Sequence, residues 1–293
     1  MKEVTIRCSG VPEHFNLPWK LAIEKGRFEA SGIHIDWVDA ASGTGAMCQD
    51  LRNGKTDMAI LLTEGALRDI DNGNPSKICS FYVNSPLVWG VHAGSHSHLS
   101  NDFVQSQVRF AISRFTSGSH LMAYVYARQK GIALSEDQFD VVNDLDGARR
   151  SLNTHANLLF LWEKFTTKPL VDLGEFKRVD ECPTPWPAFV VVARESLLQN
   201  HPELVKKVIS IVQQEAGWLK EHPKATQMIS ERYGIEQSDA ANWLSSVEWS
   251  ANTHIDKEVL KGVFDTLHNM GLVSGTTSPE STVWREEHEI EVF

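Results

Sequence analysis

Apolar and polar residues alternate in the first half of the chain with the periods of strands and helices. Residues 4–8 and 33–38 alternate with a period of two, so both segments predict strands. Between them, an apolar side at helical spacing, with Pro18 in the first turn, predicts a helix over residues 17–30. The unbroken apolar run 58–62 predicts a strand that is covered on both faces. The chain therefore begins as a series of strand–helix units.

A second strand–helix series follows, and two segments connect it with the first. Its first strand is predicted over residues 108–112 and its first helix over 120–129. Residues 162–167 are predicted as a short helix. Each connecting segment is predicted as two strands around a turn: 78–83 and 87–91 around Asn84-Ser85-Pro86, and 176–179 and 189–192 around the proline-rich turn 182–187.

The last third of the chain has helical periodicity and ends in a polar, extended tail. The predicted helices span residues 202–219, 223–233, 238–246 and 257–270.

This order of elements predicts an α/β protein with two lobes. Two crossings between two α/β lobes are typical of a hinged protein with a ligand cleft between the lobes. We expect lobe I to comprise residues 1–88 and 188–293, including the C-terminal helices, and lobe II to comprise residues 89–187. Each lobe should contain a mixed sheet with helices on both faces.

Composition excludes several classes of function. The 293 residues have a formal net charge of −10, and no basic stripe is visible, so nucleic acid is not an expected partner. No apolar run approaches the length of a membrane span, so membrane insertion is not expected. The four cysteines lie far apart, without metal-site spacing, and we expect buried thiols, no metal and no cofactor. A monomer and a dimer both remain open.

Three motifs in the first series carry a resemblance to a known family. They read Ala22-x-Glu24-Lys25-Gly26-x-Phe28-x-x-x-Gly32-Ile33, then Gly43-Thr44-Gly45, then Leu51-x-x-Gly54-Lys55-x-Asp57-Met58-Ala59. In this order and spacing they resemble the type II periplasmic binding protein family, in its branch of nitrate, sulfonate and thiamine-pyrimidine binding proteins. The segments 162–169 and 183–187 resemble a subgroup of solitary members without export signals.

The resemblance implies a two-lobe solute-binding protein that captures a small polar or aromatic ligand and closes at its hinge. Such a ligand would be a thiamine-pyrimidine precursor or an organic anion, and the expected partners are this small molecule and an ABC transporter or another protein. No export signal precedes the first strand, so we expect a cytoplasmic protein, or a periplasmic one if a leader has been removed.

Candidate ligand residues in lobe I follow the predicted strands. The resemblance implies ligand contact in the first loop, and hydroxyls or a carboxylate near helix starts can bind polar ligands, although capping of the helices would use the same residues. A carboxylate here would favour a ligand with N–H donors. These candidates are Glu13, His14, Asn16, Ser42, Gly43, Thr44, Thr63 and Glu64.

Candidate ligand residues in lobe II combine a helix start with aromatic walls. The loop before residue 120 offers hydroxyls and a guanidinium that would suit an anion, and the aromatic side chains would stack on a flat ring or else belong to the core. These candidates are Trp89, Arg114, Thr116, Ser117, Gly118, Ser119, Trp162, Glu163 and, in the late proline-rich turn, Trp186.

Two alternatives remain open from the sequence. The histidines between His92 and His98 suggest a metal site, but no acidic residue or cysteine lies among them, so a solvated loop is expected. No nucleophile motif or phosphate loop is visible, so no catalytic residue is assigned. An enzyme of the same fold in thiamine or menaquinone-type biosynthesis is the alternative function, although Cys182 stands alone where thiamine-pyrimidine synthases have a cysteine-rich motif.

Overall fold

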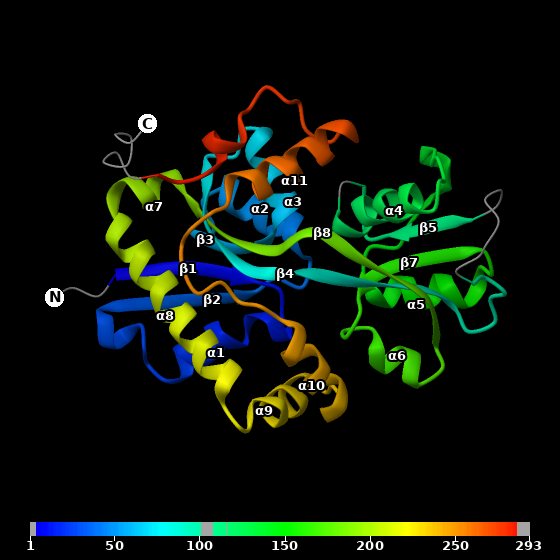
Figure 1. Cartoon of the computed structure of the whole chain (residues 1–293), viewed down its shortest axis with the longest axis horizontal. Helices are drawn as coiled ribbons and strands as arrows, with labels where there is room; N and C mark the ends of the chain where they lie inside the picture. Colours follow the sequence, from blue (N-terminus) through cyan, green and yellow to red (C-terminus); the bar gives the residue numbers. More distant parts are fainter. Residues whose placement is uncertain (1–3, 101–107, 116, 286–293) are drawn as a thin grey trace. The chain divides into compact units, whose positions relative to one another are not determined.

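The strands form one hydrogen-bonded series in the described part of the chain, which is residues 4–100, 108–115 and 117–285 of a computed structural model (Figure 1). Parallel and antiparallel pairs are mixed, as the sequence predicted. The order is β2 (Ile33–Asp39), β1 (Val4–Gly10), β3 (Met58–Leu62), β8 (Phe176–Arg194), β4 (Ser76–Gly94), β7 (Leu158–Glu163), β5 (Arg109–Ile112) and β6 (Phe139–Val141).

Contacts between residues divide the chain into two units. Unit 1 comprises residues 1–85, 186–228 and 246–293, and unit 2 comprises residues 86–185 and 229–245. Residues 229–245 therefore group with unit 2, whereas the sequence analysis placed them in lobe I. One ion pair inside unit 2 accounts for part of this grouping, because Lys168 Nζ lies 3.3 Å from Asp239 Oδ2.

Parallel pairing sets the geometry of unit 1. Strand β1 pairs along its whole length with β2 and at its end with β3, both in parallel. The carboxyl ends of the three strands therefore lie at one edge of the sheet, and the loops that follow them leave from that edge. These loops lead into the 3₁₀ turn η1 (His14–Asn16) with helix α1 (Leu17–Glu24), into α2 (Thr44–Arg52) and into α3 (Thr63–Asp71).

Helix α8 (Pro202–Glu221) packs on α1 through a buried charge. Lys25 Nζ lies 2.6 Å from Glu215 Oε2 and 3.2 Å from the centre of the Trp218 ring. Glu215 also pairs with Arg27, at 3.4 Å. The motif residue Lys25 therefore holds two helices together. Unit 1 is completed by α7 (Glu195–Asn200), α11 (Lys257–Asn269), and the 3₁₀ turns η2 (Glu29–Ser31) and η4 (Pro279–Thr282).

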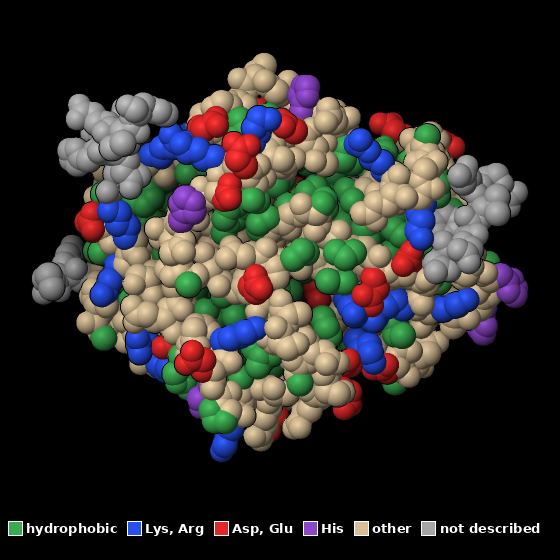
Figure 2. Space-filling view, viewed as in Figure 1, with side chains coloured by type: hydrophobic (Ala, Val, Ile, Leu, Met, Phe, Trp, Pro, Cys, Tyr) green, Lys and Arg blue, Asp and Glu red, His purple; other side chains and the backbone are tan. Residues whose placement is uncertain are grey.

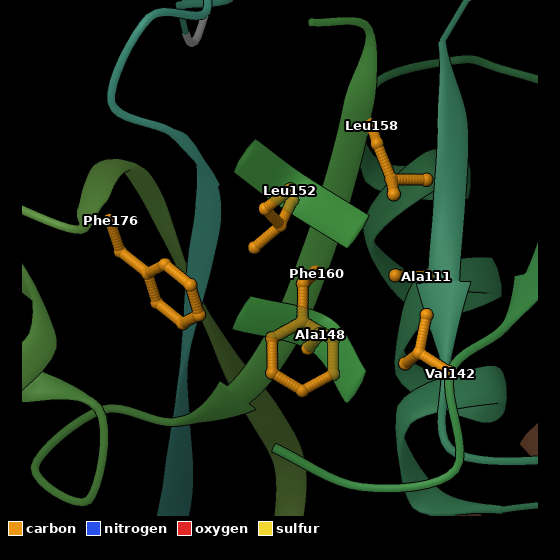
Figure 3. Close-up of a cluster of buried hydrophobic side chains, with 7 residues drawn as sticks. All are labelled: Ala111, Val142, Ala148, Leu152, Leu158, Phe160 and Phe176. Atoms are coloured by element: carbon orange, nitrogen blue, oxygen red, sulfur yellow. The ribbon is translucent and has the colours of Figure 1, made fainter. Parts of the chain in front are cut away.

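A compact apolar cluster supports the strands of unit 2 (Figure 3). Phe160 of β7 and Phe176 of β8 both belong to this cluster, and their side chains are almost completely buried. Leu152 and Ala148 come from α5 (Leu145–Thr154) and cover this side of the strands. The other helical elements here are α4 (Gly118–Gln129), η3 (Glu136–Gln138), α6 (Lys168–Asp172) and α10 (Gln237–Ser246); α9 (Ala225–Tyr233) spans a boundary between the units.

The two connecting segments are continuous strands, so the predicted turns within them were wrong. Strand β4 runs through Asn84-Ser85-Pro86, and β8 runs through the proline-rich stretch. Two backbone N–H groups of β4 donate to groups that are not part of a regular strand pairing. Asn84 N–H donates to the carbonyl of Glu248, and Leu87 N–H donates to Thr184 Oγ1. Because these bonds replace ladder bonds, the prolines do not interrupt the extended backbone.

Two predicted helices also differ. The first ends at Glu24 rather than residue 30, because Gly26 has a φ of +62° and a left-handed residue ends a helix. The segment 162–167 is not helical: β7 extends to Glu163, whose carboxylate accepts hydrogen bonds from the next turn. No helix among the described residues is long and apolar enough to cross a membrane.

Two glycine-to-alanine substitutions should move stability in opposite directions. At Gly147, in the first turn of α5, an added Cβ would overlap the carbonyl oxygen of Val142. Gly147→Ala should therefore lower the free energy of unfolding by about 1–3 kcal/mol. At Gly217, inside α8, nothing lies within 4 Å of an added Cβ, so Gly217→Ala should raise it by about 0.5–1 kcal/mol. Urea unfolding measures both values, and a Gly147→Ala protein as stable as wild type would contradict this packing.

Candidate functional site

The carboxyl edge of the unit 1 sheet brings together the candidate loops of that unit. Thr44 Oγ1 accepts a hydrogen bond from the backbone N–H of Leu62 at 3.1 Å, so the start of α2 lies against the start of α3. Thr63 Oγ1 donates to the carbonyl of Pro187 at 2.7 Å. Ser42 is exposed, and Gly43, at φ +75°, is the residue that precedes α2. The loop after β2 and the loop after β3 thus form one polar edge.

Glu64 is the most unusual side chain at this edge. Its side chain is only 2% exposed, and Oε2 accepts a hydrogen bond of 2.8 Å from the indole Nε1–H of Trp186. Oε1 is buried and has no hydrogen-bond partner among the described residues. Burial raises the pKa of Glu64 to about 7 because the charged carboxylate loses its hydration.

The first candidate loop is folded inwards rather than solvated. His14 and Asn16 are buried in η1, while Glu13 is half-buried. Phe15 stacks near His14 and contacts the ring of Phe189 at 5.1 Å between centroids. Burial lowers the pKa of His14 to about 3, so its imidazole is neutral at physiological pH.

The buried Glu64 should make stability depend on pH. Between about 4.5 and about 7 the folded chain retains a proton that the unfolded chain has released. The stabilisation is therefore complete below pH 4.5 and is lost as the pH rises to about 7. Relative to Glu64→Gln, the wild-type free energy of unfolding should fall by about 3 kcal/mol over this range. Urea unfolding at several pH values measures the free energy of unfolding of both proteins. If the two free energies changed with pH in the same way, the burial of this carboxyl would be contradicted.

In unit 2, three buried serine hydroxyls surround the start of α4. Ser119 Oγ accepts from the backbone N–H of Ser113 at 2.9 Å and lies 3.0 Å from Ser117 Oγ. Ser117 also caps the helix, accepting from the N–H of His120. Gly118 begins the helix, Arg114 is half-buried in the preceding loop, and Thr116 lies outside the described residues. Hydroxyls and first-turn amides at a helix start favour an anion.

The aromatic candidates of unit 2 lie on neighbouring strands. Trp89 of β4 pairs across the ladder with Glu163 of β7. The indole Nε1 of Trp89 is buried without a hydrogen-bond partner among the described residues. Trp162 stacks on Phe160 at 5.3 Å and packs against the apolar cluster. Trp162 thus contributes to the core, whereas Trp89 has an unused donor.

Glu163 organises the turn that follows it. Its Oε2 accepts hydrogen bonds from Phe165 N–H, Thr166 N–H and Thr166 Oγ1, at 2.7–3.0 Å. Burial raises the pKa of Glu163, while these donors act in the opposite direction. One oxygen of this candidate is therefore occupied by the chain itself.

Replacement of Glu163 should show this structural role directly. Glu163→Ala should lower the free energy of unfolding by about 3 kcal/mol, because buried donors lose their acceptor. Glu163→Gln keeps one acceptor oxygen, so its free energy of unfolding should fall by much less. Thermal or urea unfolding of the two variants measures the difference, and equal losses would argue against this hydrogen-bonded turn.

The sequence analysis missed a buried polar group in unit 2. His92 lies inside β4, completely buried, with Nδ1 3.2 Å from the carbonyl of Phe160 and Nε2 3.0 Å from Thr167 Oγ1. The expected solvated loop is therefore wrong for His92. Ser113 was also not assigned, although its position directly after a predicted strand is the signal that could have identified it.

Neither the surface charges nor the potential metal ligands among the described residues indicate a further site. Figure 2 shows acidic and basic side chains interspersed over one face of the molecule. No group of three or more potential metal ligands was found among the described residues. All four cysteines are buried free thiols.

One solved structure resembles this chain over almost its whole length. The structure of the Candida albicans CA3427 gene product, which defines a family with the generic periplasmic binding protein fold, matches with a TM-score of 0.87. The two sequences are 31% identical, and the match covers 96% of each chain. A family model described as Ca3427-like PBP matches residues 89–182. No curated protein matches this sequence.

More distant structures share the fold. The alkanesulfonate-binding protein SsuA of Xanthomonas axonopodis pv. citri, bound to MOPS, has a TM-score of 0.79 at 14% identity and covers 98% of this chain and 100% of its own. The periplasmic nitrate-binding protein NrtA of Synechocystis PCC 6803 has a TM-score of 0.72 at 15% identity and covers 95% of this chain and 84% of its own.

Proposed function

Because the chain belongs to the CA3427-like family, whose members have the generic periplasmic binding protein fold, we propose that it binds a small polar organic ligand with an anionic group. The observation that carries this proposal is the cluster of buried hydroxyls at the start of α4. The hydroxyls of Ser117 and Ser119 lie within hydrogen-bond distance of one another, and hydroxyls and backbone N–H groups are their partners in this cluster.

The chemistry of the distant structures agrees with an anionic ligand. One of them binds an alkanesulfonate and holds MOPS, and another binds nitrate. The helix dipole and the first-turn amides of α4 would stabilise such a group, and serine hydroxyls can donate to it. Aromatic or pyrimidine rings on the ligand would suit the buried indole of Trp89.

The proposal assigns the anionic group of the ligand to unit 2. The hydroxyl cluster would hold this group, and the buried indole of Trp89 has an unused N–H donor among the described residues. The bound ligand would then be delivered to a second protein, such as the ABC importers that related binding components serve.

A ligand screen followed by hydrogen exchange tests this proposal. A thermal-shift panel of alkylsulfonates, aromatic acids and thiamine-pyrimidine precursors should contain at least one stabilising compound. With that compound bound, amide exchange should slow around residues 117–120. Unchanged exchange at these amides would contradict a ligand at the hydroxyl cluster.

Two serine variants separate the role of the hydroxyl cluster from general stability. Ser119→Ala should weaken binding of the same compound about tenfold, because one hydrogen bond to a charged group is lost. Ser196→Ala, at an exposed position of α7, is the matched control and should bind as wild type does. Equal affinity for all three proteins would exclude the cluster from the site.

One observation favours an enzyme as the second candidate function. A buried carboxyl with a pKa near 7, as at Glu64, is suited to general acid–base work. A thiamine-type or menaquinone-type biosynthetic reaction would then convert the bound compound. Incubation with the stabilising compound, followed by mass spectrometry of the supernatant, distinguishes the two: an unchanged compound supports a binding protein.

A further inference from the structure

Unit 1 has a cavity at the edge of its sheet that is opposite the candidate loops. Its volume is about 680 Å³, which is within the range of small-molecule sites. We propose that this amino-edge cavity binds a small organic carboxylate, whose oxygens accept hydrogen bonds from the guanidinium of Arg7. The site is separate from the hydroxyl cluster at the start of α4 and does not depend on the proposed function. Its wall includes Thr5, Arg7, Asp57, Leu197, Asn200 and His201.

The cavity lies where the parallel strands of unit 1 begin. Thr5 and Arg7 occupy alternate positions near the start of β1, so their side chains leave the same face of the strand. Asp57 comes directly before β3. Helix α7 and the start of α8 lie on the side of the sheet where β1 begins (Figure 1), and they supply the rest of the wall. All of these residues belong to unit 1.

Asp57 holds one edge of the Arg7 guanidinium. Arg7 Nε donates to Asp57 Oδ2 at 2.8 Å, and Nη2 donates to Oδ1 at 2.5 Å. The backbone of Asp57 is fixed in turn, because its N–H donates to the carbonyl of Arg7 and its carbonyl accepts from the N–H of Arg194. Strands β1 and β8 therefore position Asp57, and Asp57 positions the guanidinium.

The second edge of this guanidinium is unused. A guanidinium carries more N–H donors than one carboxylate accepts, and the pair with Asp57 leaves Nη1 and one N–H of Nη2. Nη1 has no hydrogen-bond partner among the described residues, and the Arg7 side chain is 40% exposed. Nη1 and Nη2 together form a planar fork, which is the geometry that binds a carboxylate through both of its oxygens.

The charges around this fork permit an anion. Both oxygens of Asp57 already accept from Arg7, so the negative charge of Asp57 is compensated within the pair. Burial by itself would raise the pKa of Asp57, but the hydrogen bonds from Arg7 and the positive charge of Arg194 lower it. Asp36 also acts on the charge of Arg7, but its side chain is exposed, and water and salt screen its effect.

The α7 side of the wall suits the organic part of such a ligand. Leu197 is half-buried and offers an apolar contact. The backbone N–H of His201 donates to the carbonyl of Leu197 at 2.8 Å, which fixes His201 at the junction of α7 and α8. Its imidazole has no hydrogen-bond partner among the described residues and can contact a second polar group of the ligand.

Carboxylates and their amides test this inference. The probes are glutarate against glutaramide, benzoate against benzamide, and hexanoate against hexanamide, each titrated into the full chain and followed by ligand-observed NMR. At least one carboxylate should bind with a dissociation constant on the order of 1 mM, because water screens a partly exposed pair. Its amide should bind at least about tenfold more weakly, because it lacks the charge and one acceptor oxygen.

Two results with wild-type protein would overturn the inference. One is that no carboxylate probe binds the folded protein at millimolar concentration. The other is that each amide binds as tightly as its carboxylate.

Two arginine variants decide whether the planar fork of Arg7 carries the binding. Arg7→Lys keeps a cation beside Asp57 but removes the fork, so the affinity for the carboxylate should fall at least about tenfold. Arg52→Lys is the matched control, because Arg52 is 38% exposed, pairs with Asp69 at 2.7 Å and does not line the cavity. It should bind as wild type does. Wild-type affinity in folded Arg7→Lys overturns the inference.

A blocked cavity locates the site without any change to Arg7. Asn200→Trp places a large ring at an exposed position of the wall and should abolish carboxylate binding. Gln199→Trp, at the neighbouring exposed position of α7 outside the wall, should bind as wild type does. Retention of the probe by folded Asn200→Trp overturns the inference. If Ser119→Ala also loses that probe, the carboxylate belongs to the hydroxyl cluster, and the proposed function stands without this second site.

Discussion

The antiparallel pairing of β3 with β8 fixes most of the arrangement at the candidate site. Its register runs from Met58 opposite Ala193 to Leu62 opposite Phe189, and the strand then continues backwards to Trp186. Because α3 begins directly after Leu62, this register brings Glu64 to the indole that holds it. A shift of one residue would turn these side chains to the other face of the sheet. The polar edge of unit 1 thus depends on apolar packing between two buried strands.

Burial gives the candidate polar groups their chemical character. Glu64 and Glu163 are both removed from water, yet their surroundings differ. Glu163 accepts from the backbone and hydroxyl of the turn that follows it, whereas the side-chain donor to Glu64 is the indole of Trp186. The serines at the start of α4 are also buried, but they form hydrogen bonds with one another and with backbone amides. Hydroxyl and amide donors at the start of α4 are therefore the groups that suit an anion, whereas the buried carboxylate of Glu64 does not.

Local sequence patterns predicted most elements, because their causes are local. The apolar run 58–62 is β3 as predicted, and the helices after Pro202 lie within a few residues of their predicted bounds. The failures had non-local causes. Pro86 and the late prolines suggested turns, but the extended backbone there is stabilised by Glu248 and Thr184, which are distant in sequence.

The candidate site could be predicted only in part. Loops after parallel strands meet at one edge, so the positions of Thr44 and Glu64 followed from strand order. The environment of each residue could not be predicted from the strand order. The burial of His92 depends on contacts with Phe160 and Thr167, far along the chain, and no local pattern indicates them. Likewise, the difference between Glu64 and Glu163 lies in which donors surround each carboxylate, which only the folded chain reveals.

Native mass spectrometry of protein purified from its own cells tests the central claim most directly. Molecules released from the folded complex can be identified by their fragmentation. We predict one small organic molecule per chain that carries an anionic group. A bound small molecule without an anionic group would contradict the account.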